Sequence, residues 1–399
     1  MAGLSEETQA LVKRLVSQYE HYAVREATRR LTAAALAQHL KNLAACDGRL
    51  VVEPLGRSAG GRPIYRVTFG QGQRRVLMWT QMHGDEPTAT LAVLDLLAAL
   101  TKFPQDTALN KILREVQVCI IPMLNPDGAE TFQRRTAQGI DLNRDARCLS
   151  TPEARLLKRT HDSFVPDFAF NMHDQNPRYT VGESRRLTAM AFLAPAHDAS
   201  GKDNVARRRA KRLAAAMIQM LTPYIGGYMA RFDETHEPRS FGDAMQGWGT
   251  SVVLIESGGW RNDPEKAYLR QLNAVALLGA LHAIAGDECD ELETTAYESL
   301  PHNTNHFYDL IFESATLEFG DSIPSIVADI AINLTDPWQP PSSSDVIRGR
   351  VMDIGDLRDY EAGERWSLDG CSLSGHDFRI EAEVDVDALR AIAHPIKPV

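Results

Sequence analysis

The sequence predicts an α/β protein with a mixed, mostly parallel sheet that is covered by helices on both faces, followed by a small β-rich domain. Two observations predict this fold class. From Val76 onward, short runs of β-branched and apolar residues alternate with longer segments of helical spacing, which is the pattern of strand and helix units. After Ile284, an acidic run is followed by short alternating segments, which are typical of a separate β domain.

The length and composition predict more than one domain. With 399 residues, of which 44% are hydrophobic and 24% charged, the chain can bury one large core and a second smaller one. We expect a helical N-terminal segment at 1–49, an α/β domain at 50–286 and a β-rich domain at 287–399. The net charge of −10 argues against nucleic acid or an anionic membrane surface as the main partner, because phosphate binding depends on clustered cations.

The cysteines and the amino terminus indicate the compartment. The five cysteines are widely spread and contain no C-x-x-C pair, so neither a disulfide framework nor a thiolate zinc site is suggested. The amino terminus lacks a positive region followed by an apolar run, and no stretch of about 18 apolar residues occurs. We therefore expect a soluble protein of the cytoplasm.

The individual elements follow from local patterns. Residues 5–45 carry apolar residues at helical spacing, which predicts two helices, and residues 50–53 and 64–69 flank glycines and a proline, which predicts an edge hairpin. The strands and helices of the α/β domain are expected at 76–79, 91–100, 116–123, 153–160, 168–172, 187–193, 205–221, 252–255 and 265–284. The β segments are expected at 308–311, 315–319, 325–334, 346–354 and 378–384, with an exposed loop at 337–344.

Four apolar runs end in polar residues that can carry chemistry. His83 and Glu86 follow the first run, Asn125 opens an Asn-Pro-Asp-Gly block after the second, and His173 and Glu256 follow the third and fourth. In open α/β sheets ligands bind outside the carboxyl ends of the strands, so four such ends can converge on one crevice. Imidazole and carboxylate groups are standard zinc ligands, and the first pair has the spacing H-x-x-E.

With these residues the chain closely resembles the zinc carboxypeptidase family, which includes the pancreatic carboxypeptidases and the bacterial murein-peptide amidases. The resemblance spans about 64–284, and the order and rough spacing of five blocks match. The blocks are His83-Gly84-Asp85-Glu86, Asn125-Pro126-Asp127-Gly128, Arg134-Arg135-Thr136 with Gly139 to Asp145, Asn171-Met172-His173, and Leu254-Ile255-Glu256-Ser257-Gly258-Gly259.

The resemblance implies a ligand set. His83, Glu86 and His173 are expected to hold one zinc ion per chain and to leave its remaining position to water. Three protein ligands with an open position are the pattern of a catalytic zinc, whereas a structural zinc is closed by a fourth ligand. Asp141 matches the family position that hydrogen-bonds a ligand histidine and fixes its tautomer.

The resemblance also implies the catalytic groups. Glu256 is expected to be the general base that takes a proton from the zinc-activated water and passes it to the leaving amine. It follows a run that is expected to be buried, where an unpaired glutamate is costly, so a functional role is favoured over an ordinary salt bridge. Arg134 matches the arginine that stabilises the oxyanion, although Arg135 is adjacent and the choice between them is open.

Further positions match substrate contacts of the family. Asn143 and Arg144 match the pair that binds the terminal carboxylate of the substrate. The mobile tyrosine that caps the substrate in the family has no clear match, and counting back from the general base places His236 near its position. Arg239 falls close to the segment that lines the specificity pocket. There it would either favour a substrate with a second carboxylate or form a surface salt bridge.

The function implied is that of a zinc-dependent metallopeptidase, which hydrolyses the amide bond next to a residue with a free C-terminal carboxylate. Its partner would be a peptide or a peptide-like substrate. Two alternatives are an aspartoacylase-like zinc hydrolase of N-acyl amino acids and a non-catalytic binding protein with the same fold. The stretches 307–311, 328–332 and 349–357 resemble the β-sandwich that accompanies amidohydrolase barrels. This domain would cap the cleft or form a homo-oligomer through a β edge.

Overall fold

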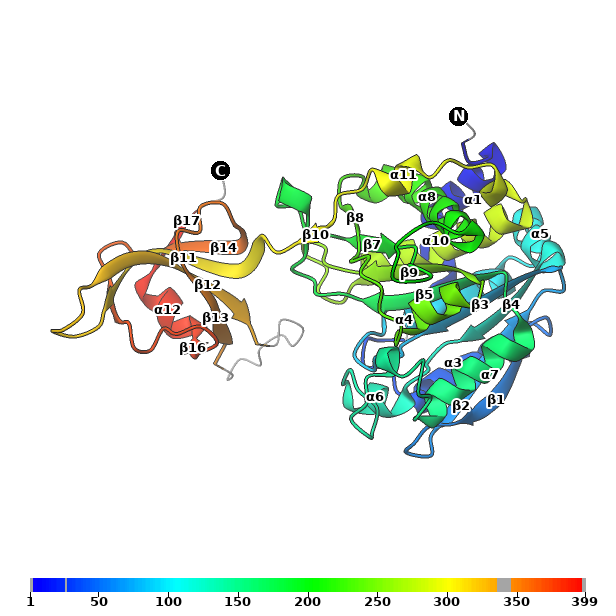
Figure 1. The fold of residues 1–399 in the computed structure, drawn as a ribbon, viewed down its shortest axis with the longest axis horizontal. Coiled ribbons are helices and arrows are strands. Elements are labelled where there is room, and N and C mark those ends of the chain that lie inside the picture. The colour runs from blue at the N-terminus through cyan, green and yellow to red at the C-terminus, as the bar shows by residue number, and fades with distance from the viewer. Residues whose placement is uncertain (1–2, 26, 336–345, 397–399) are drawn as a thin grey trace. The chain divides into compact units, whose positions relative to one another are not determined.

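The computed structural model of the chain describes residues 3–25, 27–335 and 346–396, and it divides into two compact units. We call them the α/β unit, formed by Met1–Asn176 and Ala189–Asn303, and the C-terminal unit, formed by Pro177–Thr188 and Thr304–Val399 (Figure 1). The second unit therefore takes one short segment from the middle of the chain. The sequence placed the boundary of the β-rich domain at 286/287, and the segment 177–188 was not foreseen.

The α/β unit is built on an eight-stranded sheet in the order β1-β2-β4-β3-β5-β9-β7-β8. The four central strands β4, β3, β5 and β9 are parallel, β1 and β2 pair antiparallel at one edge, and β7 joins β9 antiparallel. The expected mixed, mostly parallel sheet is thus confirmed. The strands are β1 (Val51–Arg57), β2 (Pro63–Phe69), β3 (Arg74–Thr80), β4 (Val116–Ile121), β5 (Phe168–Asp174), β7 (Met190–Leu193), β8 (Met229–Arg231) and β9 (Ser251–Ser257).

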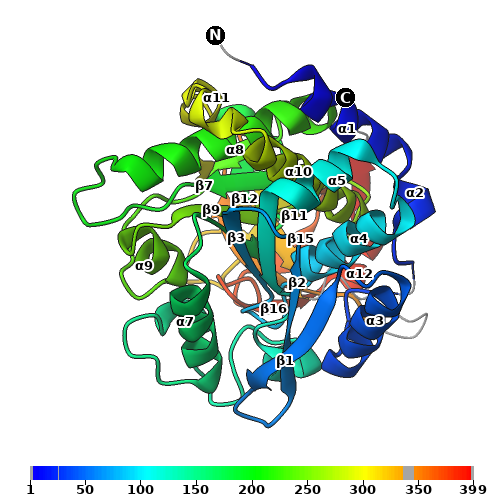
Figure 2. The same ribbon diagram turned by 90° about the vertical axis from the view of Figure 1, so that its right-hand side faces the viewer.

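Helices cover both faces of this sheet (Figure 2). One face packs against α1, α3, α4, α5, α8 and α10 in the large hydrophobic core, and the other packs against α7 and α9 in a smaller core. The helices are α1 (Glu6–Ser17), α2 (Tyr19–Tyr22), α3 (Ala33–Cys46), α4 (Thr88–Lys102), α5 (Thr107–Glu115), α6 (Pro126–Thr131), α7 (Pro152–Phe164), α8 (Val205–Ile225), α9 (Phe241–Gly247), α10 (Ala267–Ala285) and α11 (Thr295–Glu298). Helices α4 and α10 are apolar over most of their circumference because they lie between the sheet and further helices.

The N-terminal helices belong to the α/β unit. Helix α1 packs against α10, and α3 packs against α4. A buried carboxylate ties the segment down: Asp95 on α4 accepts hydrogen bonds from the hydroxyl of Tyr19 at 2.6 Å, the backbone N–H of Val24 at 2.8 Å and the guanidinium of Arg270. The segment 1–49 is therefore an outer layer of the large core, and it contains the short additional helix α2.

The acidic stretch after α10 also stays with the α/β unit. Cys289, Leu292 and Tyr297 are buried and belong to its large core. The hydroxyl of Tyr297 accepts a hydrogen bond from the backbone N–H of Ala194 at 3.1 Å. These apolar anchors explain why the compact unit extends to Asn303 although the charge pattern looks like a linker.

The C-terminal unit contains a seven-stranded sheet in the order β16-β13-β12-β11-β14-β17, with β15 paired to β11. Its elements are β11 (Phe307–Glu318), β12 (Ile326–Leu334), β13 (Arg348–Gly355), β14 (Glu361–Ser367), β15 (Ser372–Ser374), β16 (Glu383–Asp385), α12 (Val386–Ile392) and β17 (His394–Ile396). The expected C-terminal sheet domain is present. Residues of α12 lie in the core on this sheet.

The segment 177–188 joins this unit through specific contacts. Arg178 donates to Asp309 on β11 at 2.9 Å. In β6 (Thr180–Val181), the hydroxyl of Thr180 lies 2.8 Å from that of Thr304, the last residue of β10 (Asn303–Thr304). The two segments expected at 308–311 and 315–319 form the single strand β11, which carries a bulge with Ser314 at φ 58°. The loop expected at 337–344 lies outside the described residues. Across 3–25, 27–335 and 346–396, no helix is long and apolar enough to cross a membrane.

Candidate metal centre

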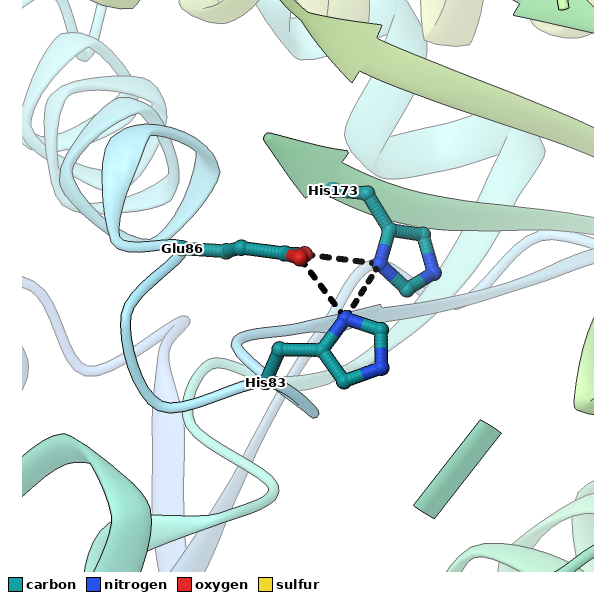
Figure 3. Close-up of side chains that lie close together, drawn as sticks. All are labelled: His83, Glu86 and His173. Atoms are coloured by element: carbon teal, nitrogen blue, oxygen red, sulfur yellow. Dashed lines mark hydrogen bonds and ion pairs between the residues drawn. The ribbon is translucent and has the colours of Figure 1, made fainter. Parts of the chain in front are cut away.

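Three side chains from two neighbouring strand ends converge at the carboxyl edge of the central sheet. His83 and Glu86 lie in the loop between β3 and α4, and His173 lies near the end of β5, which pairs parallel with β3. Their potential ligand atoms all lie within 4.8 Å of one another, and all three residues are buried. Figure 3 shows the Glu86 carboxylate facing the Nδ1 atoms of both imidazoles, each at 2.8 Å.

Close contacts with α6 fix the loop that carries His83 and Glu86. Gly84 packs against the start of α6 so tightly that a Cβ at this position would lie 1.9 Å from the carbonyl carbon of Gly128, so only glycine fits. Asn125 caps α6 by accepting from the backbone N–H of Gly128 at 2.9 Å, and its amide donates to the carbonyls of Met82 and Arg134 at 3.3 Å each. The Asn-Pro-Asp-Gly block thus connects the ligand loop to the backbone of Arg134.

Asp141 fixes the orientation of His83. Its Oδ1 lies 3.0 Å from the Nε2 of His83 and also accepts from the backbone N–H of Asn143. Because a carboxylate only accepts, Nε2 donates to Asp141, and Nδ1, on the side of Glu86 and His173, is the ring atom placed to bind a metal ion. Burial opposes a charge on His83, but Glu86 and Asp141 outweigh it and raise the pKa of His83.

Glu86 remains a carboxylate in spite of its burial. Burial favours its neutral form, but His83 and His173 outweigh that effect and lower the pKa of Glu86. Its Oε2 also accepts from the backbone N–H of Asp174 at 3.2 Å. The pKa of His173 is lowered, chiefly by burial. The ionised Glu86 and the lowered pKa of His173 suit a divalent cation, which binds carboxylate and neutral imidazole ligands.

The two adjacent arginines have different surroundings. Arg134 reaches the ligand group: its Nη1 lies 3.1 Å from Oε1 of Glu86 and 3.1 Å from Nδ1 of His83, and its Nε donates to Asp141 at 3.1 Å. Arg135 is exposed and donates to the carbonyl of Gly139 at 3.0 Å. The structure therefore brings Arg134 to the ligands and leaves Arg135 away from them.

Glu256 lies beside His173 because β5 and β9 pair in parallel with these two residues in register. Its side chain is buried, and its Oε2 has no hydrogen-bond partner among the described residues. Burial raises the pKa of Glu256 well above its usual value, and the nearby carboxylates of Glu86 and Asp174 add to this effect. A buried carboxyl oxygen without a partner next to a ligand histidine is costly, which points to a functional role.

The buried side chain of Lys266 contacts the residues that follow Glu256 and His173. The Nζ of Lys266 donates to the carbonyl of Ser257 at 2.7 Å and lies 3.4 Å from Oδ2 of Asp174. It therefore links the residues that directly follow Glu256 and His173. Sequence reasoning missed Lys266, because nothing in its exposed-looking neighbourhood, Asp263-Pro264-Glu265, indicates that the side chain turns inward.

The expected carboxylate-binding pair lies beside the N-terminus of α9. The Oδ1 of Asn143 accepts from the backbone N–H of Phe241 at 3.1 Å, which leaves its amide N–H groups available to a ligand. Arg144 donates to the carbonyl of Asn143 at 2.8 Å, lies 3.4 Å from Glu237 and keeps 41% of its side chain exposed.

The remaining two candidates are engaged with acidic neighbours. Arg239 forms a bidentate pair with Glu237, at 2.9 and 2.6 Å, and this pair lowers the pKa of Glu237 to about 2. Of the two roles expected for Arg239, a surface salt bridge or a contact to a second substrate carboxylate, the structure contains the salt bridge. His236 lies 3.2 Å from Oδ1 of Asp243, at the start of α9.

The donor set fits a zinc ion. Two imidazoles and one carboxylate are standard zinc ligands, and the contact of Nε2 of His83 with Asp141 directs Nδ1 toward the other two ligand residues. Fold and site together define a class, namely α/β proteins with a His–Glu–His group at the carboxyl ends of a parallel sheet.

The comparison with known families identifies this class. Residues 36–174 match the model of the zinc carboxypeptidase family, and that family implies a zinc cofactor. The chain is 26% identical over 256 residues to the probable carboxypeptidase 2 of Trichophyton verrucosum, an alignment that covers 60% of this chain and 49% of the relative. The carboxypeptidase 2 of Trichophyton rubrum is 25% identical over 256 residues, with 60% and 47% covered. This chain spans about half the length of these relatives.

Solved structures agree on the fold. A metallo-carboxypeptidase from Burkholderia cenocepacia superposes with a TM-score of 0.51 at 19% identity, covering 64% of this chain and 69% of its own. The carboxypeptidase A from Helicoverpa armigera gives a TM-score of 0.52 at 15% identity, covering 71% and 81%. The resemblance to the zinc carboxypeptidases that the sequence indicated is therefore confirmed.

Proposed function

We propose that the chain is a zinc metallocarboxypeptidase with one zinc ion, which hydrolyses the amide bond before a residue with a free C-terminal carboxylate. The observation that carries the proposal is the position of the buried Glu256, whose Oε2 has no partner among the described residues, next to His173 of the His83, Glu86 and His173 group. A zinc ion bound there would polarise the scissile carbonyl and lower the pKa of a water molecule to about 7.

The residues of the chain then have separate tasks. Glu256 takes the proton of the attacking water while the oxygen adds to the carbonyl carbon, and it delivers that proton to the leaving amine as the C–N bond breaks. Arg134 supplies a cation for the developing oxyanion. It is close enough to do so because it already contacts Glu86 and His83 at 3.1 Å.

The free carboxylate of the substrate is held by Asn143 and Arg144. The amide N–H groups of Asn143 and the partly exposed guanidinium of Arg144 form a pair of donors beside the N-terminus of α9. The bidentate pair of Arg239 with Glu237 argues against a requirement for a second carboxylate, because its charge is already matched.

The test is mass spectrometry of products from a peptide mixture incubated with the zinc-loaded protein. Each peptide is present with a free and with an amidated C-terminus. We expect loss of single C-terminal residues from the free acids only, and no loss with Glu256→Gln. Activity of the variant equal to that of the wild type would contradict the role of Glu256.

A lack of cleavage of either peptide set would contradict the carboxypeptidase assignment. The same samples incubated with N-acyl amino acids then test the aspartoacylase-like alternative. Because Glu256→Gln keeps the size of the side chain and all three ligands, it is also the matched control for metal content.

A further inference from the structure

Two buried polar groups lie side by side on the central strands, and neither the ligand set nor the proposed chemistry uses them. Asn171 on β5 is fully buried, and neither its Oδ1 nor its Nδ2 has a hydrogen-bond partner among the described residues. Trp79 on β3 is its register partner, and the indole Nε1 is likewise buried and unpartnered. We call Asn171 and Trp79 the buried polar pair.

The pair faces the side of the sheet that carries α9. Side chains alternate along a strand, so Asn171 points to the same side as Ala169 and His173. Ala169 and Trp79 belong to the smaller core, together with Phe241 and Met245 of α9. The pair therefore lies between the sheet and α9, and Asn171 is two residues before the metal ligand His173 on the same face of β5.

The N-terminal turn of α9 approaches the amide closely. A Cβ on Gly242 would lie 3.4 Å from Nδ2 of Asn171 and 3.4 Å from the ring of Pro195, which is ordinary van der Waals contact, so the amide lies next to this turn. The preceding residue, Phe241, donates its backbone N–H to Asn143. One helical turn thus connects Asn171 to the residue that we propose for the carboxylate of the substrate.

Leaving an amide and an indole N–H unpaired in the interior is costly, so a group that pairs with them is expected to bind there. The pair offers N–H donors from both residues and one carbonyl acceptor, and it carries no charge. A ligand with a charged side chain would place that charge beside the pair without an opposite charge. A ligand with an apolar side chain would leave the amide of Asn171 without a hydrogen-bond partner. An uncharged side chain with both an acceptor and a donor satisfies both atoms of Asn171.

We propose that Asn171, with Trp79 beside it, is the specificity-determining residue of this chain and selects a released residue whose side chain is a carboxamide, asparagine or glutamine. The inference rests on the proposed function for the position of the substrate. It adds the class of residue released, which the ligand set does not define.

The test measures the binding of free amino acids, the products of the reaction, to the metal-free protein by isothermal titration calorimetry. The probes are L-glutamine, L-asparagine, L-leucine, L-glutamate and L-lysine. We expect glutamine or asparagine to bind at least about tenfold more tightly than leucine. In Asn171→Leu, which has a similar size and no polar atoms, we expect leucine to bind more tightly than either amide.

The control is Ser251→Ala. Ser251 is also buried and its hydroxyl is also unpartnered among the described residues, but it pairs with Phe168 and faces the large core. This variant should keep the ranking of the wild type. If Asn171→Leu does not fold, Asn171→Asp keeps the shape and removes the donors, and it should lose the preference for the amides.

Three results would overturn the proposal: no amino acid binds the wild type, leucine binds it best, or an Asn171 variant keeps the ranking of the wild type. The last result would indicate that a structural water, and not the ligand, is the hydrogen-bond partner of the Asn171 amide. Peptide hydrolysis is scored separately with the zinc-loaded protein. Absence of cleavage with the ranking intact contradicts the proposed function alone, whereas cleavage with an unchanged preference in Asn171→Leu contradicts the specificity alone.

Discussion

Arg134 and Arg135 are adjacent in the sequence and have opposite surroundings. Arg134 contacts Glu86, His83 and Asp141, and Arg135 contacts only a backbone carbonyl among its described partners. We expect Arg134→Ala to lower kcat by about 10²–10³-fold, because a preorganised donor for the oxyanion is lost. Arg135→Ala should change kcat less than about threefold, and steady-state kinetics of both variants on one peptide make the comparison. Equal losses would contradict this assignment.

Asp141 should control metal affinity. It accepts from Nε2 of His83 at 3.0 Å and is also paired with Arg134. Removing its charge in Asp141→Asn should weaken zinc binding by about 10–100-fold, since the partner that orients a ligand histidine is lost. Competition with a chromogenic chelator gives the dissociation constant. Asp162→Asn, on the exposed face of α7, serves as control, and an equal change in both variants would count against the role of Asp141.

At this scale the sequence predicted the residues that belong to motifs and missed those defined by contacts. His83, Glu86, His173 and Asp141 were expected from ordered blocks, and the structure brings them together. Asn171 was quoted within one of those blocks without a role, because a missing hydrogen-bond partner is a property of three-dimensional packing. Its only signal in the sequence was an amide inside an otherwise apolar strand.

The N-terminal helices are joined to the central helices by one carboxylate. Asp95 on α4 binds Tyr19, Val24 and Arg270, and its side chain is fully buried. We expect Asp95→Ala to lower the free energy of unfolding by about 3–5 kcal/mol, because the guanidinium of Arg270 is left buried without the carboxylate that balances its charge. Tyr19→Phe should cost only about 1 kcal/mol, since it removes one hydrogen bond. Urea unfolding followed by circular dichroism measures both, and similar losses would contradict the central place of Asp95.

Among the elements, most of the long ones were predicted, although α5 (Thr107–Glu115) was missed, and several of the shortest were not. Strands β3, β4, β5 and β9 and helices α4, α8 and α10 were expected because their apolar runs are long. Helix α2, strand β8 and helix α11 are short, so tertiary packing decides their structure. The acidic stretch 287–291 looked like a linker, but the buried Cys289 and Leu292 hold it against the large core.

The whole molecule should unfold in two steps. The α/β unit and the C-terminal unit have separate hydrophobic cores. Differential scanning calorimetry should therefore show two transitions. Zinc should raise the midpoint temperature of the α/β unit alone, because its binding adds about 2.7 kcal/mol to the free energy of unfolding of that unit at a free concentration of 100 times Kd. A chelator should reverse this shift.

The matched variant for the second transition is Arg178→Ala. It breaks the pair with Asp309 inside the C-terminal unit and should lower only the transition that zinc does not move. A single transition that responds to both zinc and Arg178→Ala would show that the two units unfold together and would contradict this prediction.

The segment 177–188 has a consequence for how this protein can be rearranged. The chain leaves the α/β unit after Asn176, three residues beyond His173, and returns at Ala189. A stop codon near 303 would remove most of the C-terminal unit. It would leave the segment 177–188 without the rest of its unit, a few residues after the metal ligand His173. Gain, loss or exchange of this unit, in evolution or in the laboratory, therefore requires two coordinated edits of the gene.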